Sequence, residues 1–240
     1  MQEQLREVAD GAILFDAQVS PQVDANWFVP DYWHEQGALH TEGGGRGGIA
    51  VIETPAGECV LRHYRRGGMI AALMGDRYLW RGAARTRSFA ELRLLDAIVR
   101  LGLPGPPPVA ARYRRQGLFY RADLMTRRIV DAHTLAECLS AGRLDAALAE
   151  KVGTLVARFH QAGVWHADLN AHNVLVTPTT LYLIDFDRSR IRPQAASWRQ
   201  ANLQRLRRSL LKLGAAAQGE EAFDAAIWIP LTRAYAAMSA

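Results

Sequence analysis

The sequence predicts an α+β protein of two lobes, with a β-rich first half and a helical second half. Two short composition breaks support this division, one glycine-rich at 41–48 and one proline-rich at 103–108. Strand-like patterns follow the first break, and helical spacing of apolar residues dominates the second half. We place the lobes at residues 1–126 and 127–240, and a cleft between two such lobes is a natural ligand site.

In the first lobe, a β-hairpin follows the glycine-rich segment. The predicted strands are Ile49–Thr54, Glu58–Tyr64 and Gly117–Met125. Between the first two, Pro55-Ala56-Gly57 is a turn signal. Residues Ser88–Leu101 have the apolar spacing of a helix, and Ser88 with Glu91 forms a capping-box pattern at its start. The first lobe is therefore expected to hold a sheet and one long helix.

The second lobe is predicted to be mainly helical. The expected helices are Leu144–Ala162, Trp198–Leu213 and Ala222–Ala237. Gly163 follows the first of these where a C-terminal cap is expected. Two short apolar runs, Val174–Thr177 and Leu181–Ile184, are predicted to form a hairpin around Pro178.

The charge of the chain favours anionic partners. The net charge is +5, and of the 29 basic residues only Lys151 and Lys212 are lysines. A positive balance suits nucleotides or an anionic membrane surface. The chain has no arginine-rich, low-complexity tail, so we do not expect a nucleic-acid partner.

Several features suggest the cytosol. Cys59 and Cys138 lack metal-ligand spacing, so neither a disulfide framework nor a zinc site is expected. Residues 1–15 lack the basic-then-apolar layout of a secretory signal. No apolar run is long enough to cross a bilayer.

The most informative segment is a polar loop between the first predicted helix of the second lobe and the hairpin. It contains His166-Ala-Asp168 with Asn173 five positions later, and Asp185-Phe-Asp187 follows the hairpin. This spacing matches the H-R-D-x-x-x-x-N and D-F-G motifs of protein kinases. The combination predicts a protein-kinase-like fold that binds ATP.

Each residue type in this loop suits one part of phosphoryl transfer, which depends mainly on positioning and charge neutralisation. Asp168 is the candidate catalytic base that faces the acceptor hydroxyl. Asn173 and Asp185 are the candidate ligands of Mg²⁺, because this cation prefers oxygen donors. We expect His166 to be structural and hydrogen-bonded beneath the loop.

The first lobe is expected to bind the nucleotide phosphates. The candidate glycines, which permit close backbone approach, are Gly43, Gly44, Gly45, Gly47 and Gly48. Kinases pair a strand lysine with a helix glutamate, but the corresponding strand here has no lysine. Arg62 is the candidate replacement and Glu91 its candidate partner. Arginine also binds phosphate or carboxylate, although with a different geometry.

Segments along nearly the whole chain resemble the lipopolysaccharide core sugar kinases of Gram-negative bacteria. They are Asn26–Trp33, Val60–Gly68, Asp76–Trp80, Thr86–Glu91, Tyr120–Thr126, His166–Asn173, Asp185–Arg188 and Trp198–Leu203. The Arg-His-Tyr-x-Arg-Gly-Gly run that begins at Arg62 is more specific than the generic kinase loop, and the resemblance makes Arg62 a family feature.

Within that family, the chain is most similar to members that phosphorylate 3-deoxy-D-manno-octulosonic acid (Kdo). The resemblance implies transfer of the ATP γ-phosphate to a Kdo hydroxyl, expected at O-4, on a Kdo-lipid A precursor. It also implies a peripheral membrane protein that acts at the cytoplasmic face of the inner membrane. Asp187 replaces the glycine of D-F-G, and no Ala-Pro-Glu follows it. A glycolipid or other small acceptor is therefore favoured over a peptide.

Two alternative functions share the same loop. One is a kinase for heptose, an antibiotic or another small acceptor, and the other is a pseudokinase that binds without catalysis. Trp198–Leu213 is basic and amphipathic, so this helix either lies on an anionic membrane or packs its apolar face inside the lobe.

Overall fold

The computed structural model describes residues 1–43, 49–65 and 75–239. The chain forms two compact units of noncontiguous sequence. The first comprises Met1–Asp96 and Pro106–Arg128, and the second comprises Ala97–Gly105 and Ile129–Ala240. The segment Ala97–Gly105, which the predicted division assigned to the first lobe, thus groups with the second unit.

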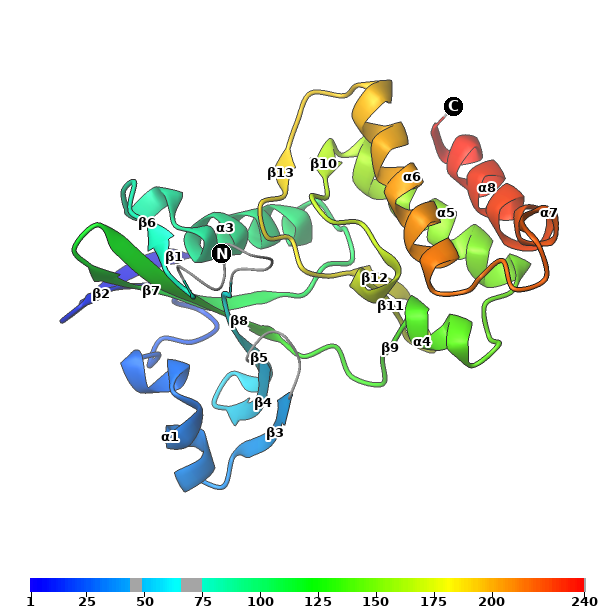
Figure 1. Cartoon of the computed structure of the whole chain (residues 1–240). Coiled ribbons are helices and arrows are strands. Elements are labelled where there is room, and N and C mark those ends of the chain that lie inside the picture. Colours follow the sequence, from blue (N-terminus) through cyan, green and yellow to red (C-terminus); the bar gives the residue numbers. More distant parts are fainter. Residues whose placement is uncertain (44–48, 66–74, 240) are drawn as a thin grey trace. The chain divides into compact units, whose positions relative to one another are not determined.

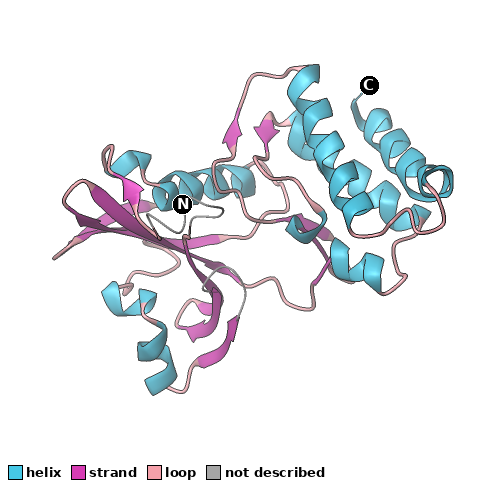
Figure 2. Ribbon diagram, viewed as in Figure 1, coloured by secondary structure: helices cyan, strands magenta, loops and turns pink. Residues whose placement is uncertain are grey.

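The first unit is built on one antiparallel sheet (Figures 1 and 2). Its strands are β1 (Glu3–Val8), β2 (Gly11–Asp16), β3 (Leu39–Gly43), β4 (Ile49–Thr54), β5 (Gly57–His63), β6 (Tyr78–Leu79), β7 (Pro108–Gln116) and β8 (Phe119–Arg127). Their order is β1-β2-β7-β8-β5-β4-β3, with β6 also paired to β8. The predicted hairpin of β4 and β5 is confirmed, and Gly57 in its turn has φ +89°.

Aromatic residues between β2 and β3 fill one part of the core of this unit. They lie on the short 3₁₀ helix η1 (Ala25–Phe28) and on α1 (Pro30–Glu35). The indole nitrogen of Trp33 donates to the carbonyl oxygen of Trp27 at 2.9 Å, and both rings are buried. This bond satisfies the indole N–H inside the core, where an unpaired polar group is costly.

Helix α3 (Arg87–Arg100) packs on the sheet, but its start differs from the capping-box prediction. Ser88 lies inside the first turn, and its hydroxyl donates to the carbonyl oxygen of Arg112 on β7. The short helix η2 (Ala83–Arg85) precedes it. The capping-box prediction is therefore wrong, because a tertiary contact with the sheet holds Ser88.

The second unit is mainly helical (Figure 2). Its helices are α4 (Leu135–Ser140), α5 (Ala146–Gln161), η3 (Ala171–Asn173), α6 (Ala196–Lys212), α7 (Glu220–Phe223), the π-helical η4 (Asp224–Trp228) and α8 (Ile229–Ser239). Its short strands are β9 (His133–Thr134), β10 (Val164–Trp165), β11 (Val174–Val176), β12 (Leu181–Leu183) and β13 (Arg190–Ile191). The predicted α5, α6 and β11–β12 hairpin are confirmed within two residues at each end.

Close packing of α5 against α8 depends on Gly153. A Cβ atom at this position would lie 2.1 Å from the carbonyl oxygen of Leu231, well inside van der Waals contact. The two helices run side by side in Figure 1. Gly163, which follows α5, has φ +73°, so the predicted helix cap is confirmed.

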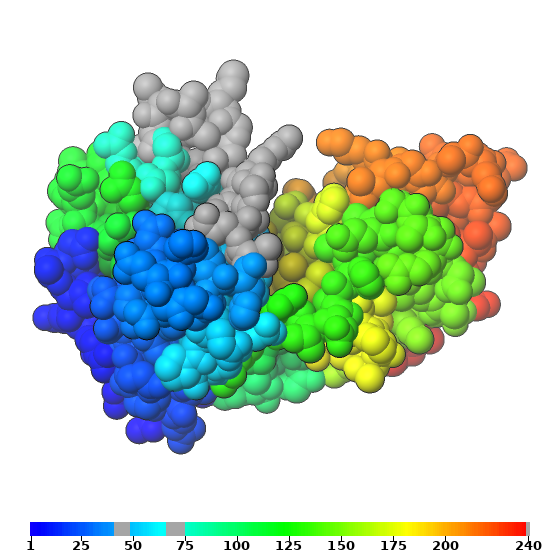
Figure 3. Space-filling model, turned by 90° about the horizontal axis from the view of Figure 1, so that it is seen from below, coloured from blue at the N-terminus to red at the C-terminus, as the bar shows by residue number. Residues whose placement is uncertain are grey.

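Helix α6 buries its apolar side. Trp198, Leu206 and Leu210 are 6%, 0% and 0% exposed, so the packed interpretation of this amphipathic helix is the one confirmed. Residues coloured orange, from α6 and the segment after it, lie at the surface of the second unit in Figure 3. Among the described helices, none combines the length and apolar character needed to span a bilayer.

Candidate active site

A buried histidine organises the polar loop of the second unit. The Nδ1 atom of His166 accepts the backbone N–H of Asp168 at 3.1 Å, and its Nε2 donates to the carbonyl oxygen of Ile184 at 2.9 Å. Burial lowers the pKa of His166, which favours the neutral imidazole that these two bonds require. The predicted structural role of His166 beneath the loop is confirmed.

Asn173 completes the connection between the loop and the hairpin. Its side-chain amide nitrogen donates to the backbone carbonyl oxygen of Asp168 at 2.9 Å. The backbone carbonyl oxygen of Asn173 accepts the N–H of Ile184 at 3.0 Å. Together with the two bonds of His166, these contacts link Asp168, Asn173 and the residue before Asp185. The structure thus joins Asp168, Asn173 and Ile184, which directly precedes Asp185, through one hydrogen-bonded assembly.

Asp185 adopts an unusual backbone conformation directly after β12. Its φ is +61°, in the left-handed region that non-glycine residues seldom occupy. The next side chain, Phe186, is fully buried and stacks on Phe159 with ring centroids 5.7 Å apart. It also contacts the His166 ring at 4.9 Å between centroids. This packing anchors the segment and holds Asp185 in a strained turn, as is common at functional sites.

The oxygen donors of Asn173 and Asp185 fit a hard divalent cation such as Mg²⁺. The hydrogen bond of Asn173 to Asp168 uses the amide nitrogen, so its side-chain oxygen is the atom oriented by the fold for another partner. Asn173 is 8% exposed, and its orientation is therefore fixed by packing as well as by this bond. Asp185 contributes a carboxylate from the neighbouring turn.

Asp168 differs from Asn173 in being accessible to solvent. Its side chain is 55% exposed. One carboxylate oxygen accepts from the Asn170 amide at 3.1 Å, and the other accepts from Arg205 on α6 at 2.8 Å. These two donors orient a carboxylate that remains open to a reactant. Arg205 is not among the predicted site residues, because only the tertiary structure brings α6 to the loop.

In the first unit, Arg62 on β5 and Glu91 on α3 form the predicted pair. Their atoms Nη2 and Oε2 are 2.6 Å apart, and the Tyr64 hydroxyl donates to the same oxygen of Glu91 at 2.5 Å. The Arg62 guanidinium also lies over the Tyr64 ring, 4.7 Å from its centroid. The side chain of Glu91 is 3% exposed, so the pair with Arg62 is largely shielded from solvent on the carboxylate side.

The predicted glycine loop lies mostly beyond what the structure describes. Gly43 is the last residue of β3 and pairs with Ile49 on β4. The other four candidates, Gly44, Gly45, Gly47 and Gly48, lie outside the described residues. Their assignment to the nucleotide phosphates stays a prediction.

A second polar network in the first unit was not expected from the sequence. Asp123 on β8 accepts from the buried Arg112 at 3.0 Å and bonds His63 Nδ1 at 2.6 Å. His63 Nε2 contacts Asp76 at 3.0 Å, and Asp76 also binds Arg121. Hydrogen bonding to Asp123 raises the pKa of His63. Three of the segments that carry the family resemblance contribute to this network, which joins β5, β7 and β8.

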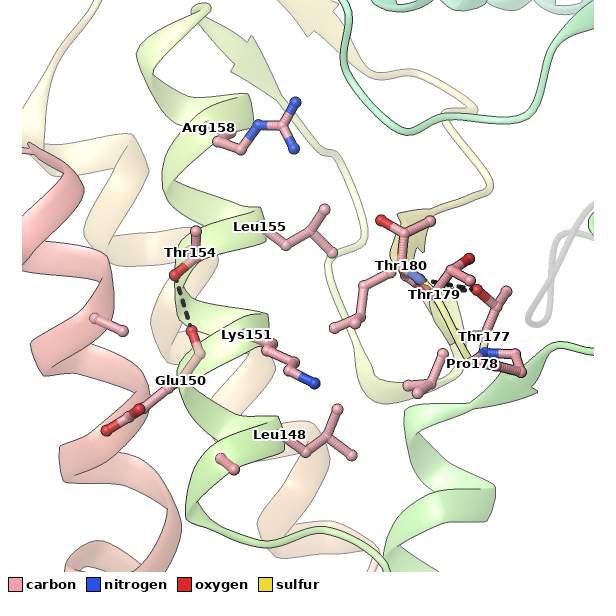
Figure 4. A pocket seen from close by; sticks show the side chains of 14 residues that line it. Leu148, Glu150, Lys151, Thr154, Leu155, Arg158, Thr177, Pro178, Thr179 and Thr180 are labelled. Carbon is pink, nitrogen blue, oxygen red and sulfur yellow. Dashed lines mark hydrogen bonds between the residues drawn. The ribbon is translucent and has the colours of Figure 1, made fainter.

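A cavity of about 600 Å³ lies elsewhere in the second unit, between α5 and the turn that joins β11 to β12. Figure 4 shows Leu148, Lys151, Leu155 and Arg158 on one side and the Thr177–Thr180 turn on the other. Among the described residues, its lining includes none of the three predicted site residues of this unit. The loop around Asp168 is therefore the stronger candidate for the chemistry.

The two-unit α+β fold is the predicted protein-kinase-like class of phosphotransferase, and the loop of Asp168 is its candidate site. A model of the lipopolysaccharide kinase (Kdo/WaaP) family matches residues 30–235. The chain belongs to this family, and the family resemblance found in the sequence is confirmed.

Curated relatives and a solved structure agree with this membership. Proteins named "3-deoxy-D-manno-octulosonic acid kinase" from Xanthomonas axonopodis pv. citri and Xylella fastidiosa are 51% and 47% identical. The alignments cover 85% and 90% of this chain and 81% and 85% of those proteins. A structure titled "WaaP in complex with acyl carrier protein" is similar with a TM-score of 0.57, covering 93% of this chain and 88% of that one. At 17% identity, that likeness concerns the fold alone.

Proposed function

We propose that this chain is an ATP-dependent kinase that phosphorylates Kdo on a Kdo-lipid A precursor, at the O-4 hydroxyl. The observation that carries the proposal is the sequence identity of 51% and 47% with two proteins named for Kdo kinase activity. The alignments cover 85% and 90% of the chain. The hydrogen-bonded assembly of Asp168, Asn173 and the Ile184–Asp185 turn supports it.

In the proposed reaction, the acceptor oxygen attacks the γ-phosphorus of ATP, and the bond from that phosphorus to the β,γ-bridging oxygen breaks. ADP leaves with the bridging oxygen, and the proton of the acceptor hydroxyl passes to the carboxylate of Asp168. An accessible carboxylate that the Asn170 amide orients suits this task, because a base must meet the hydroxyl in a defined geometry. The proton is later released to water.

Mg²⁺ is the proposed cofactor, with Asn173 and Asp185 as its protein ligands. When bound, the ion would neutralise charge on the phosphates of ATP. The role of these residues is to present oxygen atoms from a rigid turn. The buried Phe186 and the bonds of His166 and Asn173 supply that rigidity.

Arg62 is proposed to bind a phosphate of ATP while Glu91 orients it. The guanidinium is a planar group with five N–H donors, and its 21% exposed side chain is accessible to a phosphate. The Tyr64 hydroxyl donates to the Glu91 carboxylate and so helps to fix its orientation toward Arg62. Because a guanidinium is planar and binds in a forked geometry, lysine at this position is not expected to be equivalent.

The proposed location is the cytoplasmic face of the inner membrane, with peripheral attachment to its anionic surface. Both the net charge of +5 and a lipid-linked acceptor favour this location. Sedimentation of the protein with anionic and with neutral lipid vesicles tests the proposal. Binding that is equal on both kinds of vesicle would contradict it.

The proposed activity is tested by incubating the protein with ATP, Mg²⁺ and a Kdo-lipid A precursor, followed by mass spectrometry. The expected product is heavier by one phosphate, and fragmentation locates that phosphate on O-4 of Kdo. Omitting the metal and adding a chelator should abolish product formation. Parallel incubations with a heptosyl lipid and an aminoglycoside test other acceptors.

The outcomes separate the alternatives. Faster transfer to the heptosyl lipid or the aminoglycoside would replace the acceptor but keep the kinase. No transfer to any acceptor, together with measurable ATP binding, would favour a pseudokinase. Phosphate on another hydroxyl of Kdo would correct only the position.

A further inference from the structure

Helix α6 delivers one arginine to the candidate catalytic base. Arg205 Nη1 lies 2.8 Å from Oδ1 of Asp168, and the two side chains are 48% and 55% exposed. Neither the motif of the loop nor the helical pattern of α6 indicates this contact. Because both partners are about half exposed, a dissolved anion can reach the guanidinium in the same place.

The position of Arg205 is fixed by the fold on both sides. One turn before it, the Asn202 amide donates to the carbonyl oxygen of His166 at 2.9 Å. One turn after it, the Ser209 hydroxyl accepts the N–H of Ala171 at 3.1 Å. The neighbouring Leu206 is fully buried. Helix α6 is thus bonded directly to the loop that carries Asp168, and Arg205 projects from a rigid part of it.

The ion pair itself contributes little to stability. Pairs of exposed charges are worth at most about 1 kcal/mol, so exchange of one carboxylate for another at Arg205 is inexpensive. The planar guanidinium binds carboxylates in a forked geometry and keeps its charge at any physiological pH. A group built in this way beside the base suits an acceptor that carries an acid.

We propose that Arg205 binds the carboxylate of the acceptor sugar acid, and so selects an acidic sugar and frees Asp168 to take the hydroxyl proton. The inference rests on the proposed function, in which the acceptor is 3-deoxy-D-manno-octulosonic acid. In the free protein, the guanidinium of Arg205 donates to the carboxylate of Asp168. On binding, the carboxylate of the acceptor replaces it, and no covalent bond changes until phosphoryl transfer.

The test combines two acceptors with variants of one residue. The acceptors are a lipid A precursor bearing one Kdo and the same molecule with the Kdo carboxylate converted to a primary carboxamide. The variants are Arg205→Ala and Arg205→Lys, with Arg208→Ala as a control that removes an exposed arginine of the same helix. For each combination, kcat and KM are measured for both the acceptor and ATP, and thermal unfolding verifies the fold.

For the wild type, the carboxamide is expected to lower kcat/KM about 10- to 100-fold, the usual range for a lost charged hydrogen bond. Arg205→Ala should show a similar loss on the native acceptor, mainly in the acceptor KM, with the ATP KM within about twofold. The carboxamide should then cause little further loss in this variant, because the partner of the carboxylate is already gone. Arg205→Lys should recover part of the activity, and Arg208→Ala should behave as the wild type.

Losses that multiply, with the carboxamide penalty as large in Arg205→Ala as in the wild type, would overturn the proposal. That result would mean that Arg205 acts on Asp168 alone, since an effect through the base is independent of the acceptor carboxylate. Failure of the wild type to phosphorylate either Kdo acceptor would instead reject the proposed function, and this inference with it. If Arg205→Ala does not fold, the same comparison with Arg205→Lys decides.

Discussion

Asp123 in the first unit and Asp168 in the second are both paired with arginine, but their surroundings differ. The side chain of Asp123 is 4% exposed and that of its partner Arg112 is 5% exposed, whereas Asp168 is 55% exposed. Each carboxylate oxygen of Asp123 bonds one group of the fold, Oδ2 with Arg112 and Oδ1 with His63. A buried carboxylate of this kind maintains structure, and an exposed, oriented one is available to a substrate.

The histidines of the two units show the same contrast. His63 lies between the carboxylates of Asp123 and Asp76, and its pKa is raised. His160 lies between the Tyr235 hydroxyl and the Asn202 amide, and burial lowers its pKa to about 4. The neighbours of His63 therefore favour its charged form, whereas the burial of His160 favours its neutral form.

The largest expected effect is on catalysis, from Asp168→Asn. Removal of a general base typically lowers the rate about 10²- to 10⁴-fold, and we expect kcat on a Kdo acceptor to fall in this range. Unfolding temperature should change little, because the side chain is half exposed. Steady-state kinetics and thermal unfolding provide both measurements.

Glu221→Gln, which removes an exposed carboxylate of the same unit, is the matched control and should keep full activity. Activity that survives in Asp168→Asn would remove this residue from its role as base. Loss of both activity and fold would place it instead with Asp123, among the structural carboxylates.

The next effect is on stability, from Asp123→Ala. This change leaves the buried Arg112 guanidinium without its counter-ion, and such losses cost about 3–5 kcal/mol. Urea unfolding measures the change. Asp76→Ala, which removes a carboxylate that is 29% exposed, is the comparison and should cost about 1 kcal/mol. Equal costs for the two changes would contradict the distinction drawn between buried and accessible carboxylates.

A smaller effect is the dependence of stability on acid. Between pH 6.5 and about 4, His160 is protonated in the unfolded chain but not in the folded one. The free energy of unfolding should therefore fall with falling pH, and this residue alone contributes about 3 kcal/mol across the window. In His160→Gln, unfolding by urea at several pH values should show a flatter acid slope. An unchanged slope would mean that His160 titrates alike in both states.

The smallest effect has the opposite sign and comes from His63. Because its pKa is raised in the folded state by Asp123, the stability that it contributes is present below pH 6.5 and is lost as pH rises through the raised value. The free energy of unfolding, measured with urea at acidic and at alkaline pH, should therefore fall as pH rises in the wild type. In His63→Gln, the part of this decline that comes from His63 should be absent. His34→Gln, at an exposed position, is the control. A decline that persists in His63→Gln would assign it to another group.

Local patterns in the sequence predicted the elements whose cause is local. The hairpin of β4 and β5 followed from the turn signal Pro55-Ala56-Gly57 between two strand-like runs, and α5 followed from its apolar spacing and Gly163. Strands β1, β2 and β7 were not predicted. Their residues become a sheet only through pairing with distant strands, as when β2 joins β7 almost a hundred residues later.

The capping-box prediction failed for a related reason. Ser88 and Glu91 have the right spacing, but the structure uses Ser88 to bond Arg112 and Glu91 to bond Arg62 and Tyr64. A local pattern competes with tertiary partners for the same polar groups, and here the partners on the sheet prevail.

The sequence by itself determined the family of this protein and the positions of its candidate catalytic residues. The spacing of His166, Asp168, Asn173 and Asp185 is a one-dimensional property, because a short loop and a hairpin return the chain to itself within about twenty residues. The segments of the family resemblance likewise lie along the chain in order.

Only the tertiary structure decided which charges meet. Arg205 reaches Asp168 from a separate helix, and Arg112 and His63 reach Asp123 from two neighbouring strands. The chain holds 29 basic and 24 acidic residues, so charge type alone specifies no pairing among them. Packing of apolar faces places the helices and strands, and the ion pairs follow from that placement.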